Sequence, residues 1–299
     1  MTAPEHPRSP GASLPLQSEA SSPLLQVRGL TRSFGGIRAV ESLSFDAARG
    51  GITGLIGPNG AGKTTVFNLI TGVYRPTAGT ISLNGVDLTA KRPHEVVRAG
   101  VSRTFQNIRL FNRMSCLENV MVPLFARGRS SLGAFFRTPF VREEERRTRE
   151  KALAVMEEMG LADAAHRPAS TLPYGLQRKL EIARALACGL LVQGPRLLLL
   201  DEPAAGMNDA ETRELGEVIV KVQKDFDVTV MLIEHHISLV MDICTHIAVM
   251  DRGALLAEGP PQAIRSDERV VAAYLGRPRG RGAGGKTEFE RKGNDAHDR

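Results

Sequence analysis

A glycine-rich stretch at residues 57–65 constrains this chain more than any other feature. It reads Gly-Pro-Asn-Gly-Ala-Gly-Lys-Thr-Thr, follows the apolar run 52–56 and precedes a helical pattern over 66–70. A strand, a glycine-rich loop and a helix in this order are typical of a P-loop. The glycines let successive backbone N–H groups point at phosphate oxygens, and the helix N-terminus adds partial positive charge. The stretch therefore predicts a site for the phosphates of a nucleotide.

Two residues near the end of this stretch suit the chemistry of phosphates. Lys63 supplies a full charge for the β- and γ-phosphates, and Thr64 supplies a hydroxyl for Mg²⁺. Every constrained position of the motif is filled in the expected context, so a chance glycine-rich turn is disfavoured. The residues that we expect to bind the nucleotide here are Gly57, Pro58, Asn59, Gly60, Ala61, Gly62, Lys63, Thr64 and Thr65.

A second motif places two carboxylates after an apolar strand. Four leucines at 197–200 are followed directly by Asp201 and Glu202. Ligands of α/β sheets sit at the carboxyl ends of the strands, so this pair is expected beside the nucleotide. Asp201 suits a Mg²⁺ ligand that acts through water, and Glu202 suits a group that orients and polarises an attacking water. Alone, such a pair is often a helix cap, but beside a P-loop the functional interpretation is favoured.

The apolar runs also indicate the class of fold. Residues 197–200 and 228–233 are nearly continuous in apolar character, as in parallel strands buried on both faces. Residues 107–190 are mainly helical in pattern and predict a helical subdomain inserted into an α/β core. We expect strands at 25–31, 41–47, 52–56, 80–83, 101–105, 197–200, 228–233, 246–250 and 254–258, and helices at 63–72, 93–99, 141–160, 175–188, 209–224, 236–243 and 267–275.

Composition sets the boundaries of the folded part. Residues 1–23 are rich in Pro, Ser and Ala and predict a disordered leader, and the Gly/Arg-rich residues 276–299 predict a disordered basic tail. The folded part is expected over 24–275 as one nucleotide-binding unit, because no internal repeat is visible. No apolar stretch approaches the ~18 residues that a membrane span needs. Three widely spaced cysteines without a CxxC motif suit a reducing cytosol.

The net charge of +6 does not mark a nucleic-acid surface. Residues 276–299 carry seven basic and four acidic residues, and residues 127–151 carry eight basic and four acidic residues. The remainder is close to neutral, so no basic face is evident on the core. We therefore expect no nucleic-acid partner.

A third motif leads to a family. Residues 172–177 read Leu-Pro-Tyr-Gly-Leu-Gln and stand between the P-loop and the Asp-Glu strand. The three motifs together resemble an ABC-type ATPase, and this segment resembles a departed form of the family's LSGGQ signature. Gly175 matches the second glycine, whereas Pro173 replaces the serine and Tyr174 the first glycine. The resemblance implies an α/β P-loop NTPase core with a mixed sheet, an antiparallel β subdomain and an inserted α-helical subdomain.

Smaller landmarks of the family also match. Gln106 is similar to the glutamine that ligates Mg²⁺ and reports the nucleotide state to a membrane partner. His235 is similar to the switch histidine that contacts the γ-phosphate, with the neighbouring His236 as the competing candidate. Phe34 resembles the aromatic residue that stacks on adenine. The resemblance thus implies ATP and Mg²⁺ as cofactors, Glu202 and His235 as catalytic residues, and Thr64, Gln106 and Asp201 as the Mg²⁺ ligands.

The resemblance narrows to the ATP-binding subunits of branched-chain amino-acid importers. It is carried by the stretches 34–36, 103–111, 135–146, 174–184, 202–208 and 273–276, and covers nearly all of 24–276. It implies an ATPase that energises uptake of branched-chain or related amino acids. The implied partners are two transmembrane permease subunits, an extracellular or periplasmic substrate-binding protein, and a second ATP-binding subunit, either a sister chain or a second copy.

The implied location is peripheral, at the cytoplasmic face of the cell membrane. Urea, short amides or an export role for lipids remain open as alternatives within transporters. A soluble ABC ATPase acting on nucleic acid or ribosomes is the rival class. That class usually brings tandem cassettes, zinc cysteines or long coiled coils, and the sequence carries none of these.

Overall fold

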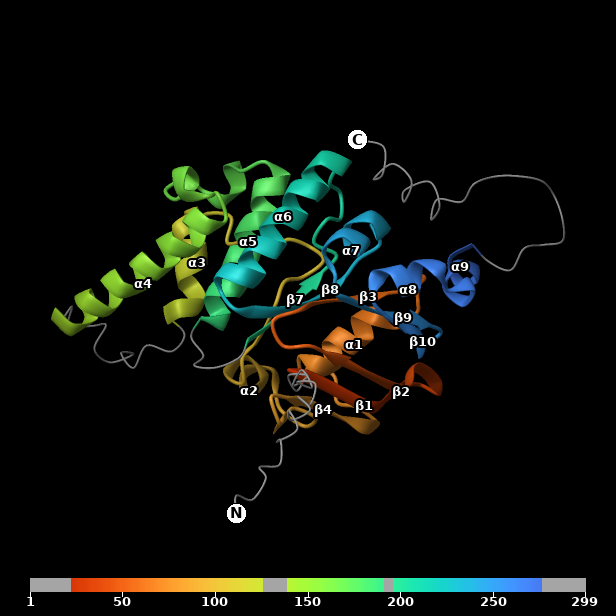
Figure 1. Ribbon diagram of the computed structural model, residues 1–299. Coiled ribbons are helices and arrows are strands. Elements are labelled where there is room, and N and C mark those ends of the chain that lie inside the picture. The colour runs from red at the N-terminus through yellow and green to blue at the C-terminus, as the bar shows by residue number, and fades with distance from the viewer. Residues whose placement is uncertain (1–22, 126–138, 191–195, 276–299) are drawn as a thin grey trace, which may run out of the picture.

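The computed structural model describes residues 23–125, 139–190 and 196–275 (Figure 1). The predicted leader, apart from residue 23, and the predicted tail lie outside the described residues. The strands are β1 (Leu25–Phe34), β2 (Ile37–Ala47), β3 (Ile52–Ile56), β4 (Ala78–Leu83), β5 (Val86–Asp87), β6 (Val101–Arg103), β7 (Arg196–Asp201), β8 (Val228–Ile233), β9 (His246–Asp251) and β10 (Ala254–Gly259). The α-helices are α1 (Lys63–Ile70), α2 (Pro93–Arg98), α3 (Cys116–Phe125), α4 (Pro139–Glu158), α5 (Tyr174–Gly189), α6 (Asp209–Asp225), α7 (Ile237–Ile243), α8 (Pro261–Ser266) and α9 (Glu268–Leu275).

A six-stranded mixed sheet forms the centre of the molecule. Its strand order is β10-β9-β3-β8-β7-β6, and all neighbours are parallel except β10, which runs antiparallel to β9. Leu55 lies opposite Ile233, and Asp201 lies opposite the same residue on the other side. The carboxyl ends of β3, β8 and β7 therefore meet at one edge of the sheet.

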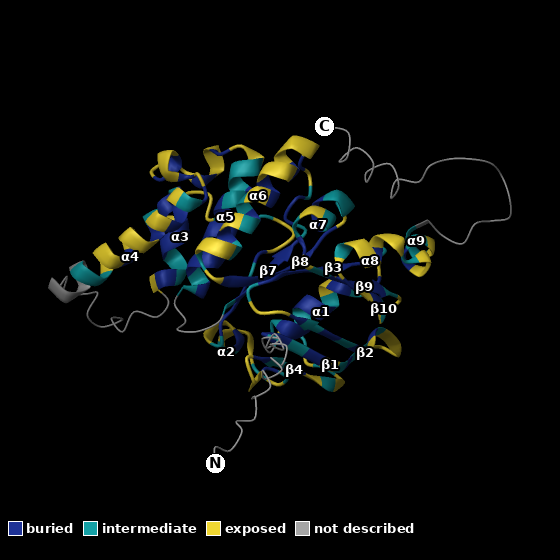
Figure 2. Ribbon diagram, in the orientation of Figure 1, coloured by how far each residue is buried: buried dark blue, intermediate teal, exposed yellow. Residues whose placement is uncertain are grey.

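Side chains of this sheet feed two separate hydrophobic cores. Leu197 and Leu199 of β7 belong to one core, whereas Leu198 and Leu200 belong to the other. This alternation follows from the period of two along a strand. Both faces of the sheet are thus covered, which explains the nearly continuous apolar runs (Figure 2).

The first core lies between the six-stranded sheet and a second, antiparallel sheet of order β2-β1-β4-β5. Helix α1 occupies the space between the two sheets (Figure 1). Its Phe67 is fully buried and packs with residues of both sheets. The P-loop is therefore anchored at its downstream end by a helix that is buried in the core.

The second core lies on the opposite face, under the helices. Helices α3, α4 and α5 pack against one another and contribute to this core, and α6 and α7 add to it. The predicted class, an α/β core with a mixed sheet, an antiparallel sheet and an inserted helical part, is confirmed. We propose that residues 24–275 act as one ATP-binding domain whose helical subdomain spans about 107–190. Within the described residues, no helix is both long and apolar enough to cross a membrane.

Several element boundaries differ from the sequence-based expectation. β2 begins at Ile37 rather than 41, because Gly35 and Gly36 adopt positive φ angles and turn the chain directly back into a hairpin with β1. The predicted strand over 101–105 ends at Arg103, because the chain there leaves the sheet. Helices α3 and α8 had no predicted range of their own, since both are short and lack a long apolar repeat.

The packing of α1 yields a prediction on stability. Replacing Phe67 by Ala should lower the free energy of unfolding by about 3–5 kcal/mol, because the cavity between the two sheets cannot collapse. Urea unfolding followed by circular dichroism measures this. Phe125→Ala is the matched control, since Phe125 is 48% exposed, and it should cost less than about 1 kcal/mol. Equal losses in both variants would contradict the placement of α1.

Candidate nucleotide-binding and hydrolysis site

The P-loop joins β3 to α1, and its glycines are required by the backbone. Gly57, Gly60 and Gly62 have φ angles of 149°, 80° and 100°. A Cβ atom at Gly57 would lie 2.1 Å from the carbonyl oxygen of Met250, and one at Gly62 would lie 2.3 Å from that of Ala39. The loop is therefore wedged against backbone on both sides, whereas Gly60 faces open space. This arrangement leaves the tip of the loop accessible to a ligand.

Lys63 lies directly beneath the loop. Its side chain is buried, and its Nζ donates to the carbonyl oxygens of Gly57 at 2.7 Å and Pro58 at 3.0 Å. Burial lowers the pKa of the Lys63 ammonium, while the charges of Glu202 and Asp201 oppose this effect. A buried cation with mainly carbonyl partners suits an incoming anion, so the loop fits a phosphate chain.

The remaining predicted P-loop residues differ in how far they are exposed to solvent. Asn59, Gly60 and Thr64 are exposed, Pro58 and Thr65 are partly exposed, and Ala61 is buried. A hollow of about 660 Å³ opens on the outer side of the loop, between residues 58–61 and the C-terminal helix α9. The loop therefore borders the C-terminal part of the chain as well as the sheet edge.

Glu202 stands directly after β7 in a conformation that a side chain rarely adopts. Its φ is +48°, in the left-handed region, and its N–H donates to the carbonyl oxygen of Ile233 at 2.9 Å. Such conformations cost on the order of 1–3 kcal/mol and cluster at functional sites. The backbone strain turns the carboxylate out of the strand direction and toward its two partners.

The two partners of Glu202 are Gln106 and His235, each of which the family resemblance implied as a site residue. Gln106 Nε2 donates to Glu202 Oε2 at 2.8 Å, and His235 Nε2 donates to Glu202 Oε1 at 3.0 Å. The structure thus brings three predicted site residues together from three strand ends. Each carboxylate oxygen is held by a different loop, which fixes the direction in which Glu202 can accept a proton.

The buried residue Glu234 fixes the backbone beneath this cluster. Its carboxylate accepts from the N–H of Ala204 at 2.7 Å, of His235 at 2.9 Å and of His236 at 3.3 Å. His235 is exposed and reaches Glu202, whereas His236 is only partly exposed and forms the N-cap of α7. The geometry therefore places His235 rather than His236 at the cluster.

Asp201, which was predicted to act on Mg²⁺ through water, forms a buried ion pair with Arg103. Its Oδ2 accepts from Arg103 Nη2 at 2.6 Å, and the carboxylate side chain is 4% exposed. Arg103 also donates to Asn68 Oδ1 of α1 at 2.7 Å. The structure therefore shows Asp201 paired with an arginine, and its role toward Mg²⁺ stays a prediction. Within the described residues, no group of three His, Cys, Asp or Glu side chains could hold a metal ion.

Phe34 lies at the end of β1, away from this cluster. Its side chain is 38% exposed, and its ring meets Tyr74 edge-on at 5.1 Å between centroids. The Arg32 guanidinium lies over the ring at 4.5 Å. One face of the ring therefore carries a cation, and an adenine would have to stack on the remaining surface.

Gly175 lies in the first turn of α5, in the helical part of the molecule. It has no positive φ angle, and a Cβ atom there would meet nothing nearer than Glu211 Oε1 at 3.9 Å. Packing within this chain therefore gives no reason for a glycine at this position, in contrast to Gly57 and Gly62.

Comparisons with known proteins identify the family of this chain. A family model described as ABC transporter matches residues 40–205, and one described as branched-chain amino acid ATP-binding cassette transporter matches residues 254–279. The chain is 46% identical over 257 residues to the high-affinity branched-chain amino acid transport ATP-binding protein BraF of Pseudomonas aeruginosa, covering 86% of this chain and 99% of the relative. It is 44% identical to LivG of Escherichia coli over the same shares of the two chains.

Solved structures of ABC transporter cassettes have the same fold. The crystal structure of the ADP conformation of MJ1267, an ATP-binding cassette of an ABC transporter, superposes with a TM-score of 0.73 at 30% identity, covering 85% of this chain and 99% of that one. A dimeric bacterial cassette, MJ0796, superposes with a TM-score of 0.65 at 22% identity and supports the fold alone.

Fold and site together define a nucleotide-hydrolysing cassette built on a P-loop. The chain belongs to the ABC transporter ATP-binding family, within the branch whose curated members are branched-chain amino acid transport ATP-binding proteins. It is accordingly an ATPase whose hydrolysis is coupled to transport.

Sequence reasoning missed three groups that organise the site: Arg103, Glu234 in its supporting role, and Arg178. Arg178 is a buried residue of α5 that donates to the carbonyl oxygen of Phe105 at 3.0 Å. The signal in the sequence that could have indicated these groups is an arginine or glutamate within an otherwise apolar or helical pattern. Such a residue must find a partner if it is buried, but the pattern does not say which one.

The contacts of the two histidines yield a prediction on turnover. His235→Ala should lower the kcat of ATP hydrolysis by roughly 100-fold, because the carboxylate of Glu202 loses one of its two partners and the γ-phosphate its predicted contact. His236→Ala should change kcat by less than about threefold. Steady-state ATPase assays on both variants measure this, with nucleotide binding checked in parallel. The reverse ranking would show that the assignment is wrong by one residue.

Proposed function

We propose that this chain is the ATP-hydrolysing subunit of an importer for branched-chain amino acids. The observation that carries the mechanism is the carboxylate of Glu202, held between Gln106 at 2.8 Å and His235 at 3.0 Å. The substrate class is supported by curated relatives at 44–46% identity over 86% of this chain. Urea, short amides and lipid export are the alternatives that an uptake test distinguishes.

The residues of the P-loop would hold the ATP phosphates. Lys63 would exchange its carbonyl partners for the β- and γ-phosphate oxygens, while the backbone of 57–62 and the N-terminus of α1 present N–H groups. Phe34 would stack on adenine. Mg²⁺, when bound, neutralises charge that develops on the phosphates. The exposed hydroxyl of Thr64, the side chain of Gln106 and Asp201, through water, are the groups that would hold it.

Glu202 would align the attacking water. Its two hydrogen bonds fix the carboxylate, and a carboxylate held in this way accepts a proton along one direction. His235 would lie next to the γ-phosphate on the same side. The left-handed backbone at Glu202 would help to aim the carboxylate at this water.

The sites would be completed by a second ATP-binding subunit, either a sister chain or a second copy. Gly175 supports this, because no contact within the described residues requires a glycine there. A missing side chain at the N-terminus of a 16-residue helix leaves the backbone N–H groups open to a γ-phosphate from outside. Pro173 lacks both a hydroxyl and an N–H, so Gly175 would carry most of this contact.

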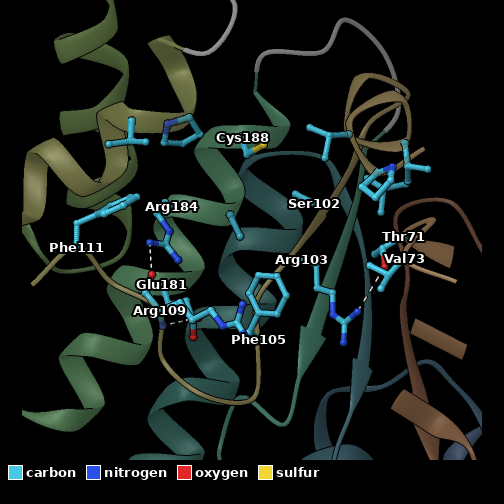
Figure 3. Close-up of a pocket in the computed structure, with 17 residues that line it drawn as sticks. Thr71, Val73, Ser102, Arg103, Phe105, Arg109, Phe111, Glu181, Arg184 and Cys188 are labelled. Carbon is cyan, nitrogen blue, oxygen red and sulfur yellow. Dashed lines mark hydrogen bonds between the residues drawn. The ribbon is translucent and has the colours of Figure 1, made fainter. Parts of the chain in front are cut away.

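The permease subunits would dock in a groove whose lining includes Phe105, the residue before Gln106 (Figure 3). The groove encloses about 540 Å³, and its walls come from α2, α3, α5 and the segment after β6. Phe105, Phe111, Val73 and Val97 expose 38–54% of their surface around it. An apolar, helix-sized groove suits an amphipathic helix of a permease, and its contact with the loop of Gln106 links it to the site. Such docking would hold the chain at the cytoplasmic face of the membrane, opposite a substrate-binding protein.

Gly175→Asp tests the second-subunit contact. Glu202→Gln should bind ATP without turnover and accumulate as an ATP-bound dimer, with itself or a sister subunit, on gel filtration with Mg²⁺. Adding Gly175→Asp to that variant should abolish the dimer, because bulk and negative charge meet the γ-phosphate, while ATP binding remains. An intact dimer in the double variant, or full turnover of Gly175→Asp with its permeases, would contradict the contact.

Cys188 offers a test of the groove, because it lines the groove and is partly exposed. Burial raises the pKa of the Cys244 thiol to about 12 and also raises that of Cys116, so both should react slowly with a maleimide at pH 7. We expect Cys188 to be labelled in the isolated chain and protected at least tenfold in the assembled transporter. Cys188→Ser provides the blank. Equal labelling in both states would place the permease elsewhere.

The substrate class is tested in cells. A strain without this chain should lose most ATP-driven uptake of leucine, isoleucine and valine at low external concentration, provided that no redundant transporter is present. The intact chain should restore uptake, and the Glu202→Gln variant should not. Normal uptake of all three amino acids would favour urea or short amides instead.

A further inference from the structure

We propose that Tyr174 and Arg178 of α5 are positioning residues for ATP hydrolysis. They fix the loop that carries Gln106 and the segment that follows Glu202 relative to each other. The inference rests on the proposed role of Glu202 and adds residues that make no contact with the carboxylate themselves.

Arg178 holds the backbone of the loop that carries Gln106. Its side chain is 3% exposed, and its guanidinium donates to the carbonyl oxygens of Phe105 at 3.0 Å and of Gln106. Glu181, one turn further along α5, neutralises the charge at 3.1 Å. A buried ion pair is costly unless its remaining donors find partners, and the planar fork of an arginine can serve two adjacent carbonyl groups at once.

The neighbouring turn of α5 strengthens this hold. The Glu181 carboxylate accepts from the N–H of Arg109 at 3.4 Å, and Arg184 donates to the carbonyl oxygen of Arg109. Figure 3 shows Glu181 and Arg184 pointing from α5 toward Arg109. Helix α5 thus holds the main chain of the loop after β6 at Phe105, Gln106 and Arg109.

Tyr174 connects the same arginine to the segment after Glu202. Its hydroxyl accepts from Arg178 Nη2 at 3.1 Å and donates to the carbonyl oxygen of Ala205 at 2.8 Å. A phenolic hydroxyl has one proton, so this single donor is committed to Ala205. A Cβ atom at Gly206 would lie 3.5 Å from the Tyr174 ring, so the ring rests against the same segment.

The two contacts converge on Glu202. Gln106, whose carbonyl oxygen Arg178 holds, donates with its side chain to the Glu202 carboxylate at 2.8 Å. Ala205, which Tyr174 holds, follows Glu202 by three residues, and its N–H donates to the Glu202 carbonyl oxygen. Helix α5 therefore acts on Glu202 in two ways. Arg178 holds the loop whose Gln106 side chain contacts the Glu202 carboxylate, and Tyr174 holds Ala205, which contacts the Glu202 backbone. Gly175 adjoins Tyr174 in the first turn of α5. The turn that is expected to meet a second subunit's nucleotide therefore also helps to fix the position of the Glu202 carboxylate, which would align the water.

Tyr174→Phe is the primary test, because it removes only a hydroxyl from a side chain that is 44% exposed and should fold normally. In the assembled transporter, we expect kcat for ATP to fall about fivefold, the effect of one or two neutral hydrogen bonds on positioning, with KM for ATP changed by less than about twofold. In a Gln106→Ala background, Tyr174→Phe should cause a smaller fold-loss, because the part of its effect that passes through Arg178 and the loop of Gln106 is already removed.

Arg178→Lys keeps the charge beside Glu181 but cannot serve both carbonyl groups, so it should lower kcat in the same way. Arg146→Lys is its matched control, because the ion pairs of Arg146 with the described residues are exposed and lie on α4, so this variant should retain the parent's turnover. If Arg178→Lys fails to fold, Tyr174→Phe alone decides the matter.

The possible outcomes separate the inference from the proposed function. Turnover of Tyr174→Phe equal to that of the parent, or the same fold-loss with and without Gln106→Ala, would overturn the positioning role while Glu202→Gln remains inactive. A KM increase without a change in kcat would overturn it as well. Normal turnover in Glu202→Gln would instead overturn the proposed site, and this inference with it.

Discussion

The parallel pairing of β3, β8 and β7 is the constraint on which the rest of the structure depends. It brings Leu55, Ile233 and Asp201 to the same level, so the P-loop, the Glu234–His235 segment and Glu202 all emerge at one edge. Parallel strands require crossovers, and both faces must then be covered. The two hydrophobic cores supply that cover, and one of them holds α1 beneath the P-loop.

Charged groups buried near this edge stabilise particular loop positions rather than the fold in general. Arg103 pairs with Asp201 and reaches α1, Glu234 collects three N–H groups, and Arg178 with Glu181 holds the loop of Gln106. Each of these groups would be costly to bury without its partners. Their common effect is to define where three loop ends stand, which is what an aligned water requires.

Three surface features of the molecule would each meet a different partner. The P-loop tip lies beside α9, and the apolar groove is lined by Phe105, the residue before Gln106. The first turn of α5 presents a glycine that no contact within the described residues requires. A nucleotide, a second ATP-binding subunit and a permease would thus each contact a different surface. Helix α5 borders the last two, which makes it the element through which they would influence Glu202.

The sequence by itself determined the α/β class, the P-loop and the candidate Glu202, because spacing and apolar pattern report backbone conformation and burial. The family resemblance added the candidates Gln106 and His235. It did not determine how these residues meet. Gln106 and Glu202 are 96 positions apart, and Arg103 and Asp201 are 98 apart. Tyr174 looked like a departure from a motif, yet its hydroxyl contacts Ala205. Only the tertiary structure decides such contacts, because a hydrogen bond depends on distance and direction between groups that the assembled sheet brings together.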